Sequence, residues 1–274
     1  MTRSEQRLYH QALEYIGKNW SKASLTRQKL LQNIRSLAKH MAGQGLQHIS
    51  HMKSKHIERY FAEMKDKGLA GSTLQNHATA ARVLAKAIGK ANIVPSTNAA
   101  LNCTRGDRYK PIIPNNEKLA VIREQLGKLD QRLLAAHDMR EAFGLRAKES
   151  IVSKSVCEID GRKYLIVEGA KGGRPRLLEI SAGMQEQAIA QVHKIIAEQG
   201  TKTIIPETMT LKAFYHYQKN TLFALGARRN DGSSMHSLRH GYAQAERAKG
   251  KTNGAIQRGL GHGESRTQKH YMPE

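Results

Sequence analysis

The chain has 274 residues, enough for one large domain or two ordinary ones, and 45 basic residues against 23 acidic ones give it a formal net charge of +22. Its two cysteines are too few for a disulfide framework or a cysteine zinc site, and no apolar run reaches the roughly 18 residues of a membrane helix. A chain this basic usually binds a polyanion, and nucleic acid is the first candidate because binding to phosphates releases counterions. A basic protein that is merely soluble is the simpler alternative.

The first hundred residues show apolar side chains at helical spacing in four stretches and no strand pattern. The apolar positions are Leu8, Tyr9, Leu13 and Ile16; Leu30, Leu31, Ile34, Leu37 and Met41; Ile57, Tyr60, Phe61 and Met64; and Leu74, Ala81, Leu84 and Ile88. Ser54 is the expected N-cap of the third helix, and Ser72 is expected to open the fourth. These residues predict a small helical domain over 1–100.

Residues 91–114 differ from what precedes them, because they hold three of the six prolines and few regularly spaced apolar positions. This composition predicts turns and a linker, which we place at 101–114. Its basic residues Arg105, Arg108 and Lys110 would either follow a phosphate backbone or lie in a solvated loop, and the sequence favours neither.

The second half, residues 115–274, mixes helical and strand patterns. Two strands, VCEID and KYLIVE, meet at Asp160-Gly161, a dipeptide favoured in tight hairpin turns, and a third strand, RLLEI, is expected at about 176–180. Helices are predicted at about 115–126, 129–142, 184–199, 211–226, 236–248 and 252–259. The expected fold class is mainly α with a small antiparallel β-sheet.

Six residues of this half could carry chemistry, and each alone is a weak signal: Arg146, Lys171, His236, Arg239, His262 and Tyr271. Each is as easily a surface residue, an ion-pair partner or part of a polar helix face. Their order is the informative feature. It runs G-L-R-x-x-E, a hairpin-loop lysine, H-x-L-R-H, L-G-H, and a tyrosine nine residues after that last histidine.

This order and spacing resemble the tyrosine recombinase family, which includes phage integrases and Xer-type resolvases. The resemblance covers residues 115–274 at the level of motifs, while residues 1–100 resemble the family's core-binding domain only in size, helicity and charge. It implies an N-terminal helical SAM-like core-binding domain and a C-terminal α+β catalytic domain. The implied activity is site-specific DNA recombination by an integrase of a phage or mobile element.

Carried over by position, the resemblance gives each residue a role. Tyr271 is the nucleophile, Arg146 and Arg239 bind the phosphate, Lys171 protonates the leaving 5′-oxygen, His236 is the candidate base, His262 adds a hydrogen bond, and Glu149 supports Arg146. Planar guanidinium donors suit an anionic phosphodiester whose transition state they stabilise. A covalent 3′-phosphotyrosyl link conserves bond energy, so no cofactor, ATP or metal is implied, and EGAKGGR lacks P-loop spacing.

Two alternatives stay open. A type IB-like topoisomerase would use a similar residue set as a monomer, and a regulatory DNA-binding protein could keep the scaffold without activity. Only three residues follow Tyr271, where family members usually continue with a segment that docks on a neighbouring subunit. Either the sequence is truncated or assembly uses other contacts.

The expected partners follow from the resemblance. They are double-stranded DNA with specific recombination sites, further copies of the chain in a homo-tetramer on that DNA, and DNA-bending accessory proteins. The free protein is expected to be a monomer or weak oligomer. The two cysteines and the lack of a signal peptide suit a bacterial or phage-encoded protein of the cytoplasm, associated with the nucleoid and not with a membrane.

Overall fold

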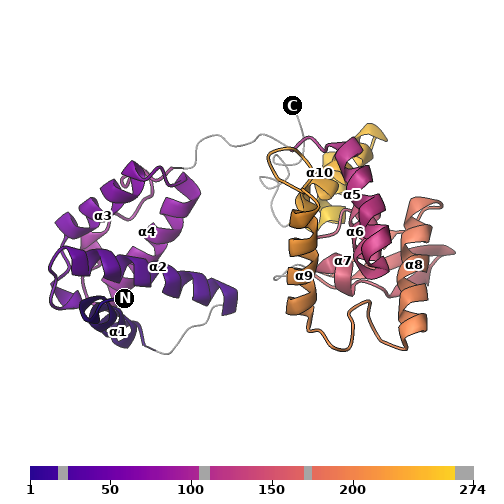
Figure 1. Cartoon of the computed structure of the whole chain (residues 1–274). Coiled ribbons are helices and arrows are strands. Elements are labelled where there is room, and N and C mark those ends of the chain that lie inside the picture. Colours follow the sequence, from indigo (N-terminus) through magenta and orange to yellow (C-terminus); the bar gives the residue numbers. More distant parts are fainter. Residues whose placement is uncertain (18–23, 105–111, 170–174, 263–274) are drawn as a thin grey trace. The chain divides into compact units, whose positions relative to one another are not determined.

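The computed structural model describes residues 1–17, 24–104, 112–169 and 175–262 (Figure 1). The chain divides into two compact units, Met1–Arg108 and Tyr109–Glu274, each of which is considered by itself. The linker residues Arg105, Arg108 and Lys110 lie outside the described residues, so their contact with phosphates stays a prediction, as do the domain limits drawn from the sequence.

The first unit is helical, as predicted. It contains α1 (Arg3–Ile16), α2 (Ser24–Gly43), α3 (Ser54–Asp66) and α4 (Gly71–Ala87), with two short 3₁₀ turns, η1 (Ile49–His51) and η2 (Ala91–Ile93). The predicted apolar stripes supply its core, with Leu8, Ile34 and Leu84 fully buried. α2 packs on both α1 and α4, which closes the core.

Two helix starts in this unit differ from the prediction. Ser54 is the first residue of α3 and not its N-cap, because the Nδ1 atom of His56 accepts the Lys53 N–H at 3.0 Å and the cap falls one residue earlier. Likewise α4 begins at Gly71 and not at Ser72. Both shifts amount to one residue. They arise because local hydrogen bonds set the helix ends, and the apolar pattern does not encode those bonds.

The second unit combines helices with one sheet, which confirms the predicted fold class. Its elements are α5 (Asn116–Leu129), α6 (Gln131–Phe143), α7 (Glu149–Val152), β1 (Val156–Ile159), β2 (Arg162–Val167), β3 (Arg176–Glu179), α8 (Met184–Gln199), α9 (Leu211–Ala224), α10 (Met235–Ala248) and α11 (Asn253–Leu260). The strands form an antiparallel sheet in the order β1-β2-β3. Asp160 and Gly161 make the β1–β2 turn with φ of 51° and 71°, as their sequence suggested.

Helix α6 packs against three other helices of this unit, α5, α8 and α10 (Figure 1). Its buried residues include the charged side chains of Asp138 and Arg140 as well as apolar ones such as Met139 and Phe143. The helix ends at Gly144, which adopts the left-handed conformation with φ 62° and ψ 28°. The chain then turns sharply into α7, and this turn carries the first part of the site.

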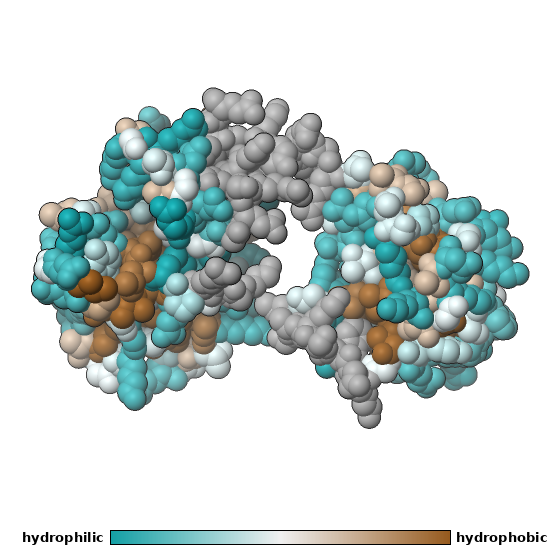
Figure 2. Space-filling model, turned by 180° about the vertical axis from the view of Figure 1, so that it is seen from behind, coloured by the Kyte–Doolittle hydropathy of each residue, from teal (hydrophilic) through white to brown (hydrophobic). Residues whose placement is uncertain are grey.

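The surface of both units is largely hydrophilic on the face shown in Figure 2. No helix in the described ranges is both long and apolar enough to cross a membrane.

Candidate active site

The turn between α6 and α7 holds Arg146 and Glu149 against each other. The Arg146 N–H donates to Oε2 of Glu149 at 2.8 Å, and its Nη1 donates to Oε1 at 2.7 Å. The Glu149 carboxylate is fully buried, while the Arg146 side chain keeps an exposed fraction of 33%. The pairing predicted from G-L-R-x-x-E is therefore present, and it leaves the Arg146 guanidinium partly open to solvent.

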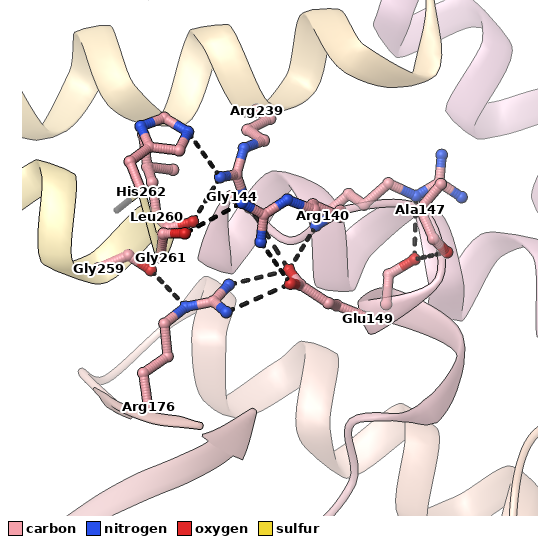
Figure 3. A network of polar contacts seen from close by, with 12 residues as sticks. Arg140, Gly144, Ala147, Glu149, Arg176, Arg239, Gly259, Leu260, Gly261 and His262 are labelled. Carbon is pink, nitrogen blue, oxygen red and sulfur yellow. Dashed lines mark hydrogen bonds and ion pairs between the residues drawn. The ribbon is translucent and has the colours of Figure 1, made fainter. Parts of the chain in front are cut away.

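Arg239 comes from α10 and reaches the same place from the other side (Figure 3). Its Nη1 donates to the Gly144 carbonyl oxygen at 2.6 Å and its Nη2 to the Leu260 carbonyl oxygen at 2.5 Å. Nη2 also lies 3.0 Å from Nε2 of His262. The side chain is fully buried. These bonds join the end of α6 to the end of α11.

His262 follows α11, and Gly261 makes the turn that presents it. Gly261 has φ 64°, and its carbonyl oxygen accepts a bond of 3.1 Å from Nη2 of Arg146. Burial lowers the pKa of the His262 ring to about 3, and the positive charges of Arg239, Arg146 and Arg176 lower it further in the same direction. The ring is therefore neutral at pH 7.

His236 lies one helical turn before Arg239 on α10, as the H-x-x-R spacing predicted. Its ring packs edge-on against His240, with 5.0 Å between ring centroids. Burial lowers its pKa to about 4, with the positive charges of Arg239, Arg229 and Arg146 acting in the same sense. The ring is therefore in the neutral form that can accept a proton, although these three positive charges make it a weaker base than a free imidazole.

Arg176 also belongs to this cluster, although nothing in the sequence pattern singled it out. It begins β3, and its Nη2 and Nη1 lie 2.9 and 3.3 Å from the two Glu149 oxygens. Its Nε donates to the Gly259 carbonyl oxygen at 2.7 Å (Figure 3). The sequence feature that could have pointed to Arg176 is its place at the start of the strand that follows Lys171. The side chain therefore ties the hairpin to both α7 and α11.

The charges around Glu149 do not balance. Burial by itself would raise the pKa of this carboxyl, but hydrogen bonds from Arg176 and Arg146 outweigh it and lower the pKa to about 2. Three guanidinium groups thus surround one carboxylate, while His236 and His262 are neutral. This cluster of Arg146, Arg176 and Arg239 with an excess of positive charge is suited to hold an anion such as a phosphate.

Not every residue predicted for the site can be placed. Arg146, Glu149, Arg239 and His262 come together through direct contacts. His236 lies close enough for the charges of three arginines, two of them Arg146 and Arg239, to lower its pKa. Lys171 and Tyr271 lie outside the described residues, so their positions stay predictions.

A group with metal-ligand chemistry lies elsewhere on α6. The ligand atoms of His137, Asp138 and Glu141 are within 4.8 Å of one another. Arg123, however, already donates two bonds of 2.7 Å to the two oxygens of Asp138. Because a guanidinium balances that carboxylate, the group is a poor cation site.

Comparisons with known proteins gave two family matches. A family model described as "Integrase" matches residues 108–245, and one described as "Phage integrase, N-terminal" matches residues 6–94. The first match ends before His262 and Tyr271. A search of the curated proteins gave no match.

Solved structures share the fold at low sequence identity. XerH site-specific recombinase bound to a difH substrate before cleavage has TM-score 0.66 and 17% identity, over 91% of this chain and 76% of that one. A lambda integrase tetramer bound to a Holliday junction has TM-score 0.68 and 16% identity, over 99% and 78%. The Tn1549 transposon integrase with transposon right end DNA has TM-score 0.62 and 17% identity, over 98% and 95%.

Proposed function

This chain belongs to the integrase family of site-specific recombinases, and from that premise we propose that it cuts and rejoins DNA through a 3′-phosphotyrosyl link to Tyr271. The supporting observation is the cluster of Arg146, Arg176 and Arg239 around the single buried carboxylate of Glu149. Such preorganised donors are worth most when they face charge that develops in the transition state.

In the proposed reaction the Tyr271 oxygen attacks phosphorus and the bond to the 5′-oxygen breaks. His236 takes the phenolic proton, and Lys171 gives a proton to the departing 5′-oxygen, which leaves as a hydroxyl. Attack by a 5′-hydroxyl from a partner strand reverses these transfers and restores a phosphodiester, so bond energy is conserved.

Arg146 and Arg239 differ in their access to substrate. Arg146 is partly exposed and can meet a phosphate oxygen directly. Arg239 is fully buried, so its contact with a phosphate requires its surroundings to move when DNA binds. His262, bonded to Arg239, would then add a further donor.

The proposed partners are double-stranded DNA carrying paired specific sites and three further copies of the chain on that DNA. The lambda integrase tetramer on a Holliday junction supports this assembly by analogy of fold. DNA-bending accessory proteins and a place of action at the bacterial nucleoid belong to the same proposal.

The test is covalent capture. DNA sites are first selected by binding to the Tyr271→Phe variant and sequenced, then prepared as suicide substrates with a nick near the cleavage position. The wild-type chain should form an adduct that survives SDS, Tyr271→Phe should form none while still binding DNA, and Tyr217→Phe on α9 is the matched control. An adduct with Tyr271→Phe would show a different nucleophile. No adduct with the wild-type chain would favour the regulatory alternative.

A further inference from the structure

Arg140 is a fully buried arginine on α6 whose guanidinium is only partly hydrogen-bonded. Its Nε donates to Oγ of Ser150 at 3.0 Å, whereas Nη1 and Nη2 have no hydrogen-bond partner in the described part of the chain. Arg123, by contrast, is paired through both of its bonds with Asp138. Burial lowers the pKa of Arg140 to about 10, so the group still carries its charge at neutral pH.

A buried cation without a counter-ion is unfavourable, because the low-dielectric interior does not replace its lost hydration. An apolar side chain of similar length would fill the same space without this penalty. The charge therefore works against the stability of the fold, and such conflicts concentrate at functional positions.

Within the described residues, the one hydrogen bond of the Arg140 side chain goes to Ser150, next to the active-site turn. Oγ of Ser150 accepts from Arg140 and donates to the Ala147 carbonyl oxygen at 3.0 Å, while the Ser150 N–H donates to the Arg146 carbonyl oxygen at 2.9 Å. Figure 3 shows Arg140 and Ala147 joined through this contact, beside the Glu149 network. Ser150 is itself buried, so water does not compete for these bonds.

We propose that Arg140 is a positioning residue that, through Ser150, holds the turn 144–149 in the geometry in which Arg146 faces the phosphate. A hydroxyl that only donates to Ala147 can rotate away from it. A charged donor on its lone pair fixes that rotation, because charge-assisted hydrogen bonds are the stronger kind. The inference rests on the proposed strand-transfer activity.

The experiment compares Arg140→Met, Ser150→Ala and the double variant with the wild-type chain on the same suicide substrate. Each single variant should form the adduct about tenfold more slowly or worse, with DNA affinity changed by less than about twofold, since a small misplacement of a catalytic group costs rate and not binding. The double variant should form the adduct no more slowly than the single variants, because Arg140 acts on the turn 144–149 only through Ser150. Arg140→Met should unfold at an equal or higher urea concentration. Arg123→Met, the matched control on the Asp138 pair, should unfold earlier and cleave normally.

Hydrogen exchange gives a readout that does not depend on activity. The amides of residues 144–152 should exchange faster in Arg140→Met and Ser150→Ala than in the wild-type chain. If Arg140→Met does not fold, Ser150→Ala decides the question alone.

Wild-type rates in Ser150→Ala, or additive losses in the double variant, would overturn the inference while the proposed function stands. A wild-type chain that forms no adduct would instead be a failure of the proposed function.

Discussion

Arg176 and Glu149 form a two-bond ion pair in which the carboxylate is fully buried and the arginine has an exposed fraction of 9%. The pair joins the first residue of β3 to the first residue of α7. Because Arg176 also donates to the Gly259 carbonyl oxygen, one side chain links three segments that are distant along the chain. Arg176 therefore holds the start of β3 against α7 and the end of α11.

Replacing Arg176 by Met should lower the free energy of unfolding by about 3 kcal/mol, because it removes a positive charge and two hydrogen bonds from the buried Glu149 carboxylate. Urea unfolding of the purified chain measures this. The control is Arg162→Met, which removes an exposed pair with Glu179 at 3.5 Å and should cost less than about 1 kcal/mol. Equal losses in the two variants would mean that the buried pair contributes no more than a surface one.

The Glu149 carboxyl should make the chain sensitive to acid. Its pKa in the folded state, about 2, lies below the ordinary value of 4.5, so its contribution is fully present above about pH 4.5 and is lost as the pH falls toward 2. The shift corresponds to about 3 kcal/mol at most. The difference in unfolding free energy between wild type and Glu149→Gln should therefore shrink between pH 5 and pH 3. A difference that stays constant over this range would contradict the assignment.

The low pKa values of His236 and His262, about 4 and about 3, predict that both rings are neutral throughout the ordinary pH range of an assay. Neutral His236 can act as a base, so kcat/KM for adduct formation should show no loss from histidine protonation between pH 8 and pH 6. The pH profile of kcat/KM reports the free protein and is the right measurement. A half-loss of rate close to pH 6.5 that disappears in His236→Gln would refute the prediction.

Gly144 should tolerate no side chain. Its φ of 62° is unfavourable for other residues, and an added Cβ would lie 2.8 Å from Cγ of Tyr242. Gly144→Ala should therefore unfold much more easily than Gly200→Ala, whose φ is 63° but whose Cβ would meet nothing within 4 Å. In Gly200→Ala the free energy of unfolding should fall only by the cost of a left-handed backbone at a residue with a Cβ, about 1–2 kcal/mol. Similar midpoints in thermal unfolding would show that the Tyr242 ring moves aside freely.

Arg146→Ala and Arg239→Ala should slow cleavage far more than they weaken DNA binding. Binding is spread over many phosphate contacts, whereas each of these groups acts on one phosphate. Gel-shift affinity and single-turnover cleavage separate the two effects. Parallel losses in affinity and rate would mean that these arginines only hold DNA.

Local signals explain why so much of the fold could be predicted. The stripe at Leu8 and Leu13, the Asp160-Gly161 turn and the H-x-x-R spacing on α10 all involve residues within a few positions of each other. Helix α7 was not predicted, because a single turn has no periodicity. It forms where the buried Glu149 side chain accepts the Arg146 N–H.

The order of residue types along the chain was enough to determine the fold class, the family and the identity of the main catalytic candidates. Only the tertiary structure showed that Arg176 bonds to Glu149 and Arg140 to Ser150, that Arg239 is buried, and that burial and nearby arginines lower the pKa values of His236 and His262. The physical reason is that burial, counter-charges and hydrogen-bond partners come from segments far apart in sequence, and no local pattern records which of them will meet.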